Sequence, residues 1–177
     1  MTRRFGDRAT FAVEVGEMKS PALRVVNLWA ADKWLTTDDD VTYVPSISWY
    51  MRLDAQRVRQ RDIRPCPFPG LAPEEIFRLL HGDETDFREQ FWFMRWGQSV
   101  DNVSAYAYLD DDLVIIFRFW RARHPFPEDL GKVFVARIPP DEFAAIVEEA
   151  ANLLDAGSSA EDPTSGPRQT SEPEQEH

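Results

Sequence analysis

Alternating apolar and polar residues predict strands in the first third of the chain. In the stretch ATFAVEV, Phe11, Val13 and Val15 occupy every second position, which is the period of a half-buried strand. The stretch LRVVNLWA at 23–30 is read as its partner strand. In SISWYMRL at 46–53, alternate apolar residues would share one face, so we predict a third strand there.

Two helices and three further strands are predicted in the rest of the chain. The stretch LAPEEIFRLLHG at 71–82 has Pro and two Glu near its start and Gly82 at its end, as expected of a short helix. Two strand-prone runs within 103–122 flank three aspartates and predict a hairpin. KVFVARI at 132–138 adds a strand, and an apolar stripe within 139–157 predicts a closing helix.

This order of elements predicts the α+β class, with an antiparallel β-sheet and helices packed on one of its faces. A chain of 177 residues has the size of one domain, which we assign to residues 1–155. Residues 156–177 contain no aromatic residue and no Leu, Ile or Val. They therefore lack the apolar surface that ordering requires, and we predict a disordered acidic tail.

The formal net charge of −11 argues against nucleic acid as a partner, because phosphate binding requires an excess of Lys and Arg. The last 23 residues contain six acids and one base, which leaves a net charge of −6 in residues 1–154. The folded part is therefore acidic itself, and its charge suits a basic protein partner.

Two further features favour a cytoplasmic protein without membrane contact. The longest clean apolar run, Leu113–Phe117, is much too short to span a bilayer. Cys66 is the single cysteine, so the chain cannot form an internal disulfide and does not depend on an oxidising compartment.

The search for catalytic and metal-binding motifs gives little support for an enzyme. His81, His124 and His177 show none of the spacings of zinc sites, and the chain has neither a Gly-rich phosphate loop nor a nucleophile elbow. We therefore expect no cofactor and no metal ion. A pocket that brought Cys66, His81 or His124 within hydrogen-bond reach of a carboxylate would instead indicate an enzyme.

Two runs of three aspartates with aromatic neighbours form the strongest candidate for a binding surface. Neither run has the spacing of a calcium-binding loop, so the runs are either solvated turns or part of an interface. The aromatic residues are likewise either core or partner-binding, and Trp and Tyr among carboxylates suit a protein interface. The candidate partner-binding residues are Asp38, Asp39, Asp40, Tyr43, Asp110, Asp111, Asp112 and Trp120.

Both ends of the folded region resemble a known family. The opening RFGDRATFAVEV resembles the Phe-Gly-Asp and Phe-Ala-Ile-Glu pattern that begins a bacterial immunity-protein family of polymorphic toxin systems, the family numbered forty-two. The ending GKVFVARIPPDEFAAIVEEAANLL is similar to the final strand and helix of that family. The middle, including WAADKWLTTDDD and PCPFPGLAPEE, does not follow the family's pattern.

The resemblance implies a non-catalytic protein that binds and neutralises a cognate toxin inside the cell, and it assigns no site residue. Many toxins of this kind are nucleases with basic clefts, so the acidic charge agrees with this role. Two alternatives stay open at this point. One is an acidic protein-interaction module of unrelated role, and the other is an enzyme that uses Cys66, His81 or His124.

Overall fold

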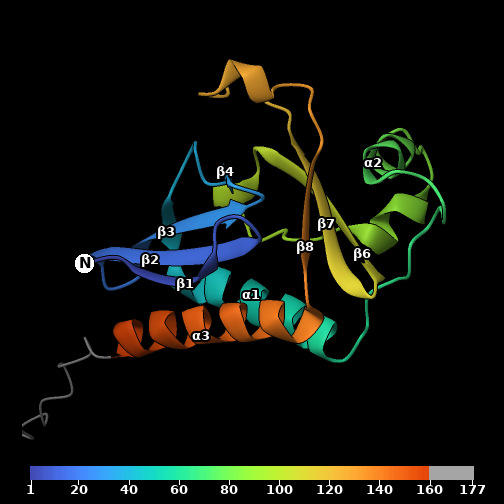
Figure 1. Ribbon diagram of the computed structural model, residues 1–177. Coiled ribbons are helices and arrows are strands. Elements are labelled where there is room, and N and C mark those ends of the chain that lie inside the picture. The colour runs from blue at the N-terminus through green and yellow to red at the C-terminus, as the bar shows by residue number, and fades with distance from the viewer. Residues whose placement is uncertain (160–177) are drawn as a thin grey trace, which may run out of the picture.

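The computed structural model describes residues 1–159, in which eight strands, three α-helices and three short 3₁₀ helices are present (Figure 1). The strands are β1 (Arg3–Asp7), β2 (Phe11–Ser20), β3 (Leu23–Ala30), β4 (Lys33–Trp34), β5 (Val41–Tyr43), β6 (Val103–Asp110), β7 (Asp112–Phe119) and β8 (Phe134–Ile138). The helices are α1 (Val44–Arg59), α2 (Pro73–His81) and α3 (Pro140–Ser159), and the 3₁₀ helices are η1 (Asp86–Phe91), η2 (Gln98–Val100) and η3 (Pro127–Asp129).

The predicted boundary of the acidic tail at residue 156 is too early, because helix α3 continues to Ser159. The remainder of the predicted tail, residues 160–177, lies outside the described residues.

The strands pair antiparallel in two separate sheets. The first sheet has the order β1-β2-β3-β4, with β5 also paired to β3, and the second has the order β6-β7-β8. The predicted α+β class is confirmed. The strands are divided between two sheets, a division that alternation along the chain does not specify.

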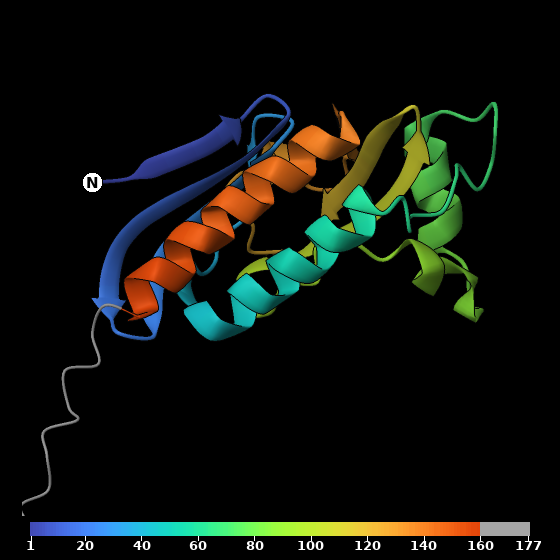
Figure 2. The same ribbon diagram turned by 90° about the horizontal axis from the view of Figure 1, so that it is seen from below.

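Helices α1 and α3 lie side by side and cover one side of both sheets (Figures 1 and 2). Their apolar faces meet the inward residues of β2 and β3 and one face of the second sheet, and together these side chains form the main core. The largest fully buried members include Phe11, Leu28, Ile47, Met51, Phe117, Phe119 and Phe143.

Helix α2 lies on the opposite face of the second sheet, where it forms a smaller core. Because side chains alternate between the two faces of a strand, residues 106 and 108 of β6 point away from the main core. The members of the smaller core are Ile76, Phe77, Leu80, Phe91, Tyr106, Tyr108, Val114 and Ile116. The second sheet is thus covered on both faces, whereas the first sheet has a helix layer on one face.

The predicted strand at 46–53 is wrong, because this segment belongs to helix α1. A window of eight residues shows alternation, but Val44, Ile47, Met51, Ala55 and Val58 are all buried and recur at helical spacing over the longer segment. Pro at the first turn is also typical of a helix start. None of the helices in the described part of the chain has the length and apolar character needed to cross a membrane.

The Phe5-Gly6-Asp7 sequence lies at the end of β1, directly before the tight turn into β2. Gly6 has a φ of 85°, and a Cβ atom there would lie 2.3 Å from the carbonyl oxygen of Phe11 and 2.8 Å from a methyl carbon of Ile146. The Asp7 side chain accepts a hydrogen bond from the backbone N–H of Ala9 at 2.9 Å. Glycine at this position therefore permits the positive φ near the end of β1 and the close approach of Phe11 and helix α3.

Replacing Gly6 by alanine should lower the free energy of unfolding by about 2 kcal/mol or more, because the new methyl group meets backbone in a left-handed conformation. Gly70→Ala is the matched control, since Gly70 also has a positive φ, of 89°, but has open space around its Cα. Urea denaturation of both variants measures the difference. Equal losses would show that the backbone angle alone, and not the packing against α3, requires glycine.

Candidate functional site

A cleft of about 380 Å³ opens between helix α1, the segment 92–101 and strand β6. Aromatic rings line it from all three elements: Tyr50 from α1, Trp92 from the segment, and Tyr106 from β6. Trp120, which follows β7, closes a fourth side, and its indole N–H donates to the backbone carbonyl of Asp101 at 2.7 Å. The cleft therefore has walls of large, semi-rigid side chains that suit contact with another molecule.

Asp54 of helix α1 holds the segment that forms the cleft. Its Oδ2 accepts hydrogen bonds from the Trp96 indole N–H at 2.8 Å and from the Met94 backbone N–H at 3.2 Å. Its Oδ1 accepts from the Arg57 guanidinium at 3.0 Å. Burial raises the pKa of this carboxyl group, while the bonds from Trp96, Arg57 and Met94 act in the opposite direction. Met94 has a φ of 53°, a strained conformation that these contacts stabilise.

Helix α1 presents a further apolar stripe beside the cleft. Trp49 is 60% exposed, and its ring lies 5.0 Å from that of Tyr50. Leu53 is one helical turn further along and is also exposed. The cleft wall thus continues onto the outer face of α1.

A second groove, of about 290 Å³, adjoins the cleft because Gly97 lines both. Tyr43 and Asp39 line this groove, and Tyr43 is 56% exposed. We use the term aromatic surface for the aromatic residues that line the two depressions, Tyr43, Tyr50, Trp92 and Trp120, together with Trp49, whose ring packs on Tyr50.

The first aspartate run lies at the edge of the aromatic surface, with its side chains in three different situations. Asp38 forms an ion pair with Arg121 at 2.7 Å, and Arg121 follows Trp120 in the chain. The Asp39 side chain accepts from the backbone N–H of Val41 at 3.1 Å. Asp40 lines a separate depression next to the N-terminus. The structure therefore brings Asp38, Asp39, Tyr43 and Trp120 to one side of the molecule.

The second aspartate run is at the other end of the β6–β7 hairpin. Asp110 pairs with Asp112, and Asp111, with a φ of 59°, forms the turn between them. Trp120 follows the opposite end of β7, which has eight residues, so the two ends are roughly 25 Å apart at the rise of an extended strand. The two aspartate runs therefore do not share one patch, and whether either contacts a partner stays a prediction.

Sequence reasoning missed several residues of the cleft and placed others differently. Tyr106 and Tyr108, which precede the second run in the sequence, are buried in the smaller core. Burial raises the pKa of Tyr108 to about 12. Trp92 and Arg95 belong to the stretch FWFMRWG, which has no period that distinguishes its buried residues from its exposed ones. The guanidinium of Arg95 lies 3.4 Å from the centroid of the Trp92 ring.

The three candidate catalytic side chains of the described region do not come together with a carboxylate. His124 is buried and stacks on Phe119 with ring centroids 4.0 Å apart. His81 contacts the Tyr106 hydroxyl and the Arg118 guanidinium through its two ring nitrogens, while Cys66 packs against the smaller core. Within residues 1–159, no group of three or more His, Cys, Asp or Glu side chains is arranged to hold a metal ion.

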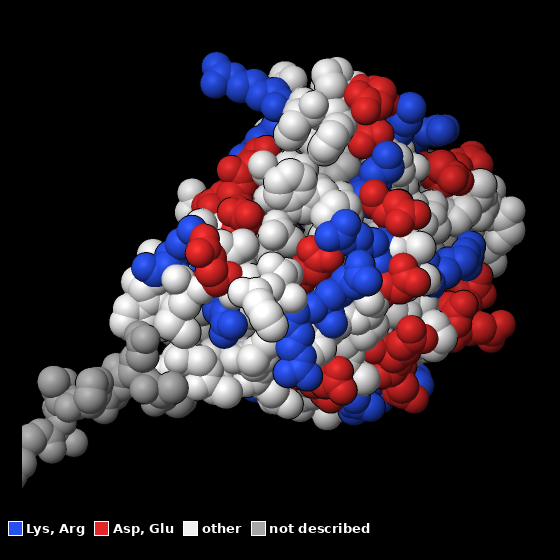
Figure 3. Space-filling view, turned by 60° about the vertical axis from the view of Figure 1, so that its left-hand side comes forward, with Lys and Arg blue, Asp and Glu red and all other residues white. Residues whose placement is uncertain are grey.

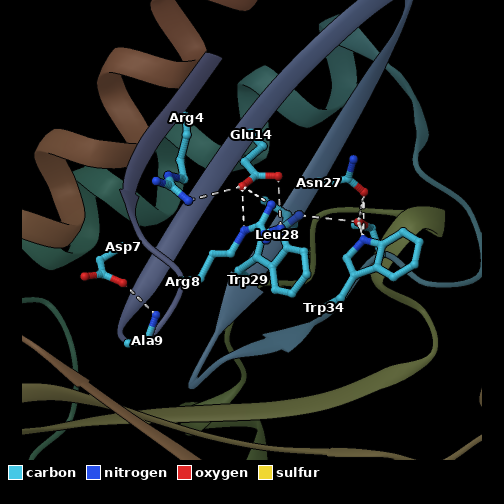
Figure 4. Close-up of polar contacts among 10 residues, drawn as sticks. Arg4, Asp7, Arg8, Ala9, Glu14, Asn27, Leu28, Trp29 and Trp34 are labelled. Carbon is cyan, nitrogen blue, oxygen red and sulfur yellow. Dashed lines mark hydrogen bonds and ion pairs between the residues drawn. The ribbon is translucent and has the colours of Figure 1, made fainter. Parts of the chain in front are cut away.

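The outer face of the first sheet carries a polar and aromatic network whose members bond to one another (Figure 4). Glu14 accepts from the Arg8 guanidinium at 2.7 Å and from the Trp29 indole N–H at 3.2 Å. Trp34 donates to Asn27 at 2.7 Å and stacks on Trp29. Acidic and basic side chains are interspersed over the face of the molecule that Figure 3 presents. Because the network satisfies its own polar groups, we interpret it as structural.

Replacing Asp54 by alanine should lower the free energy of unfolding by about 3 kcal/mol, because it leaves the buried N–H of Trp96 without an acceptor and Arg57 without its partner. Asp141→Ala is the control, since Asp141 forms an exposed ion pair with Arg61 and should cost less than about 1 kcal/mol. Chemical denaturation measures both. Similar small losses would mean that Asp54 does not anchor the segment.

Comparison with known proteins identifies no relative of this chain. No protein-family model matches the chain, and neither a curated protein nor a solved structure is similar to it. The resemblance of the two ends to an immunity-protein family therefore stays a hypothesis. The features of this chain that bear on its function are its charge, the cleft and the aromatic surface.

Proposed function

We propose that this protein is an immunity protein that binds a cognate protein toxin in the cytoplasm and blocks the toxin's active site. The observation that carries the proposal is the aromatic surface, because Tyr43, Trp49 and Trp120 are each more than half exposed. Tyr43 and Trp120 line adjoining depressions, and Trp49 packs on Tyr50, which lines the cleft. Exposed Trp and Tyr side chains gathered in this way are typical of residues that dominate binding energy in protein interfaces.

The rigidity of the surface supports this role. Tyr50 and Trp49 project from a helix of 16 residues, and the segment that carries Trp92 is fixed to the same helix by Asp54. Trp120 is held by its bond to the carbonyl of Asp101. A surface that is already ordered before binding loses little conformational entropy when the partner docks.

The charge of the chain supports a basic partner. The net charge of −11 would attract a cationic toxin over long range and accelerate encounter, while the aromatic contacts would slow dissociation. Asp39 and Asp101 lie next to the aromatic surface, and neither forms an ion pair with a base among the described residues. Both carboxylates can therefore pair with Lys or Arg of the toxin.

The direct test is co-expression with a toxin encoded beside this protein's gene. Survival of cells that carry both genes, and death of cells that carry the toxin alone, is the expected result. Absence of a toxin-like neighbour, or of protection, would leave an acidic interaction module with another partner as the better description. Turnover of a small molecule that depends on Cys66, His81 or His124 would instead establish an enzyme.

Truncation of the exposed tryptophans should raise the dissociation rate of the complex. For Trp49→Ala and Trp120→Ala we expect an increase of at least about tenfold, because central Trp anchors commonly contribute more than about 1.4 kcal/mol. Leu79→Ala is the control, since Leu79 is 45% exposed but lies on α2. Surface plasmon resonance with the purified toxin measures the rates. An unchanged rate in both Trp variants would place the interface elsewhere.

A further inference from the structure

The floor of the cleft is unusually rich in hydrogen-bond donors for an acidic protein. Arg95, Ser104 and Tyr106 all line it. No carboxylate of the described residues lies within ion-pair distance of Arg95, whose guanidinium is stacked on Trp92. A guanidinium has five N–H donors and no acceptor, so the stacked group presents its free donors to the cleft.

A chain of hydrogen bonds makes the Tyr106 hydroxyl a donor toward the cleft. The guanidinium of Arg118 lies 2.9 Å from Nε2 of His81, and since Arg can only donate, Nε2 must accept. A neutral imidazole then carries its proton on Nδ1, which lies 3.4 Å from the Tyr106 oxygen and donates to it. The Tyr106 hydroxyl therefore keeps its own proton for a second hydrogen bond.

The surroundings of His81 agree with the neutral ring that this assignment requires. Burial lowers the pKa of His81, and the charges of Arg118 and Arg88 lower it further. The ring stacks on Phe77 with a centroid distance of 5.4 Å, and Arg88 donates to the backbone carbonyl of His81 at 3.2 Å. The contacts with Phe77 and Arg88 thus hold His81 in place, and the bond from Arg118 sets its tautomer.

The balance of charge around the floor favours a ligand with a single negative charge. Arg88, Arg95 and Arg118 all act electrostatically on the Tyr106 phenol, and none of the three forms an ion pair among the described residues. Asp101 also lines the cleft, and Glu89 acts on Arg95 from nearby. Asp83 also acts on the Tyr106 phenol, so three carboxylates oppose three guanidinium groups, and the floor has no excess of positive charge to favour a doubly charged phosphate.

We propose that the floor of the cleft is a carboxylate-binding subsite, in which Arg95, Ser104 and Tyr106 bind an Asp, Glu or C-terminal carboxylate of a partner protein. Arg118 and His81 are positioning residues, because they orient the Tyr106 hydroxyl without touching the ligand. The rings of Tyr50, Trp92 and Trp120 would cover the apolar part of the same side chain. The nature of the partner rests on the proposed function, whereas the chemistry of the subsite does not.

The test uses the isolated full-length protein and acetate as the probe, followed by the backbone amide signals of Gly97 and Ser104 in NMR spectra. We expect saturable shifts with acetate and none with acetamide, which has the same shape without the charge. Arg95→Gln and Tyr106→Phe should each weaken acetate binding by about fivefold or more. Arg137→Gln is the control, since Arg137 is exposed on β8 and should leave binding unchanged.

Absence of saturable shifts with acetate, or equal affinity in wild type and Arg95→Gln, would overturn the subsite. Tighter binding of inorganic phosphate than of acetate would overturn its assignment to carboxylates. Because no toxin is present in this experiment, acetate binding by a protein that fails to protect cells would support the subsite and reject the proposed function. Protection of cells by a protein that does not bind acetate would support the proposed function and reject the subsite.

Discussion

The buried carboxylate of Asp54 is the interaction on which the candidate site depends. It joins helix α1 to the segment at 92–101 by accepting from Trp96 and from the Met94 backbone, residues 42 and 40 positions away in the sequence. Without these acceptors, the strained backbone at Met94 and the buried N–H of Trp96 would have no compensation. The wall of the cleft that carries Trp92 therefore depends on the buried carboxylate of Asp54. Burying this charge costs desolvation energy, and the ion pair between Asp54 and Arg57 offsets part of that cost.

Local signals predicted much of the fold. Helix α2, the β6–β7 hairpin, strand β8 and helix α3 each have a period and end signals within one stretch, and all are confirmed. The prediction of a strand at 46–53 was wrong because eight residues can show alternation by chance. The helical spacing from Val44 to Val58 is visible only over a longer window. Division of the strands into two sheets depends on which faces α1, α2 and α3 cover, and no single stretch encodes that.

The candidate site was predictable only in part. Tyr43 and Trp120 are exposed as expected of binding residues. Asp38 and Asp39 lie near them, whereas Asp40 lines a separate depression. The cleft itself could not be found from sequence, because its walls come from α1, the segment at 92–101 and β6 and meet through contacts over long range. The position of the second aspartate run could not be predicted either. The run has the same composition as the first, but it lies at the far end of the β6–β7 hairpin.

The central claim is that a partner docks on the aromatic surface, beside the first aspartate run and far from the second. The two runs allow a matched comparison, in which Asp38, Asp39 and Asp40 are changed to Asn in one variant and Asp110, Asp111 and Asp112 in another. Both variants lose the same formal charge, so the comparison separates the position of the charge from its amount. Association rates with the toxin should be measured at two salt concentrations. We expect the first variant to associate more slowly and with a weaker salt dependence than the second. Equal rates in the two variants, or a larger effect of the second, would contradict it.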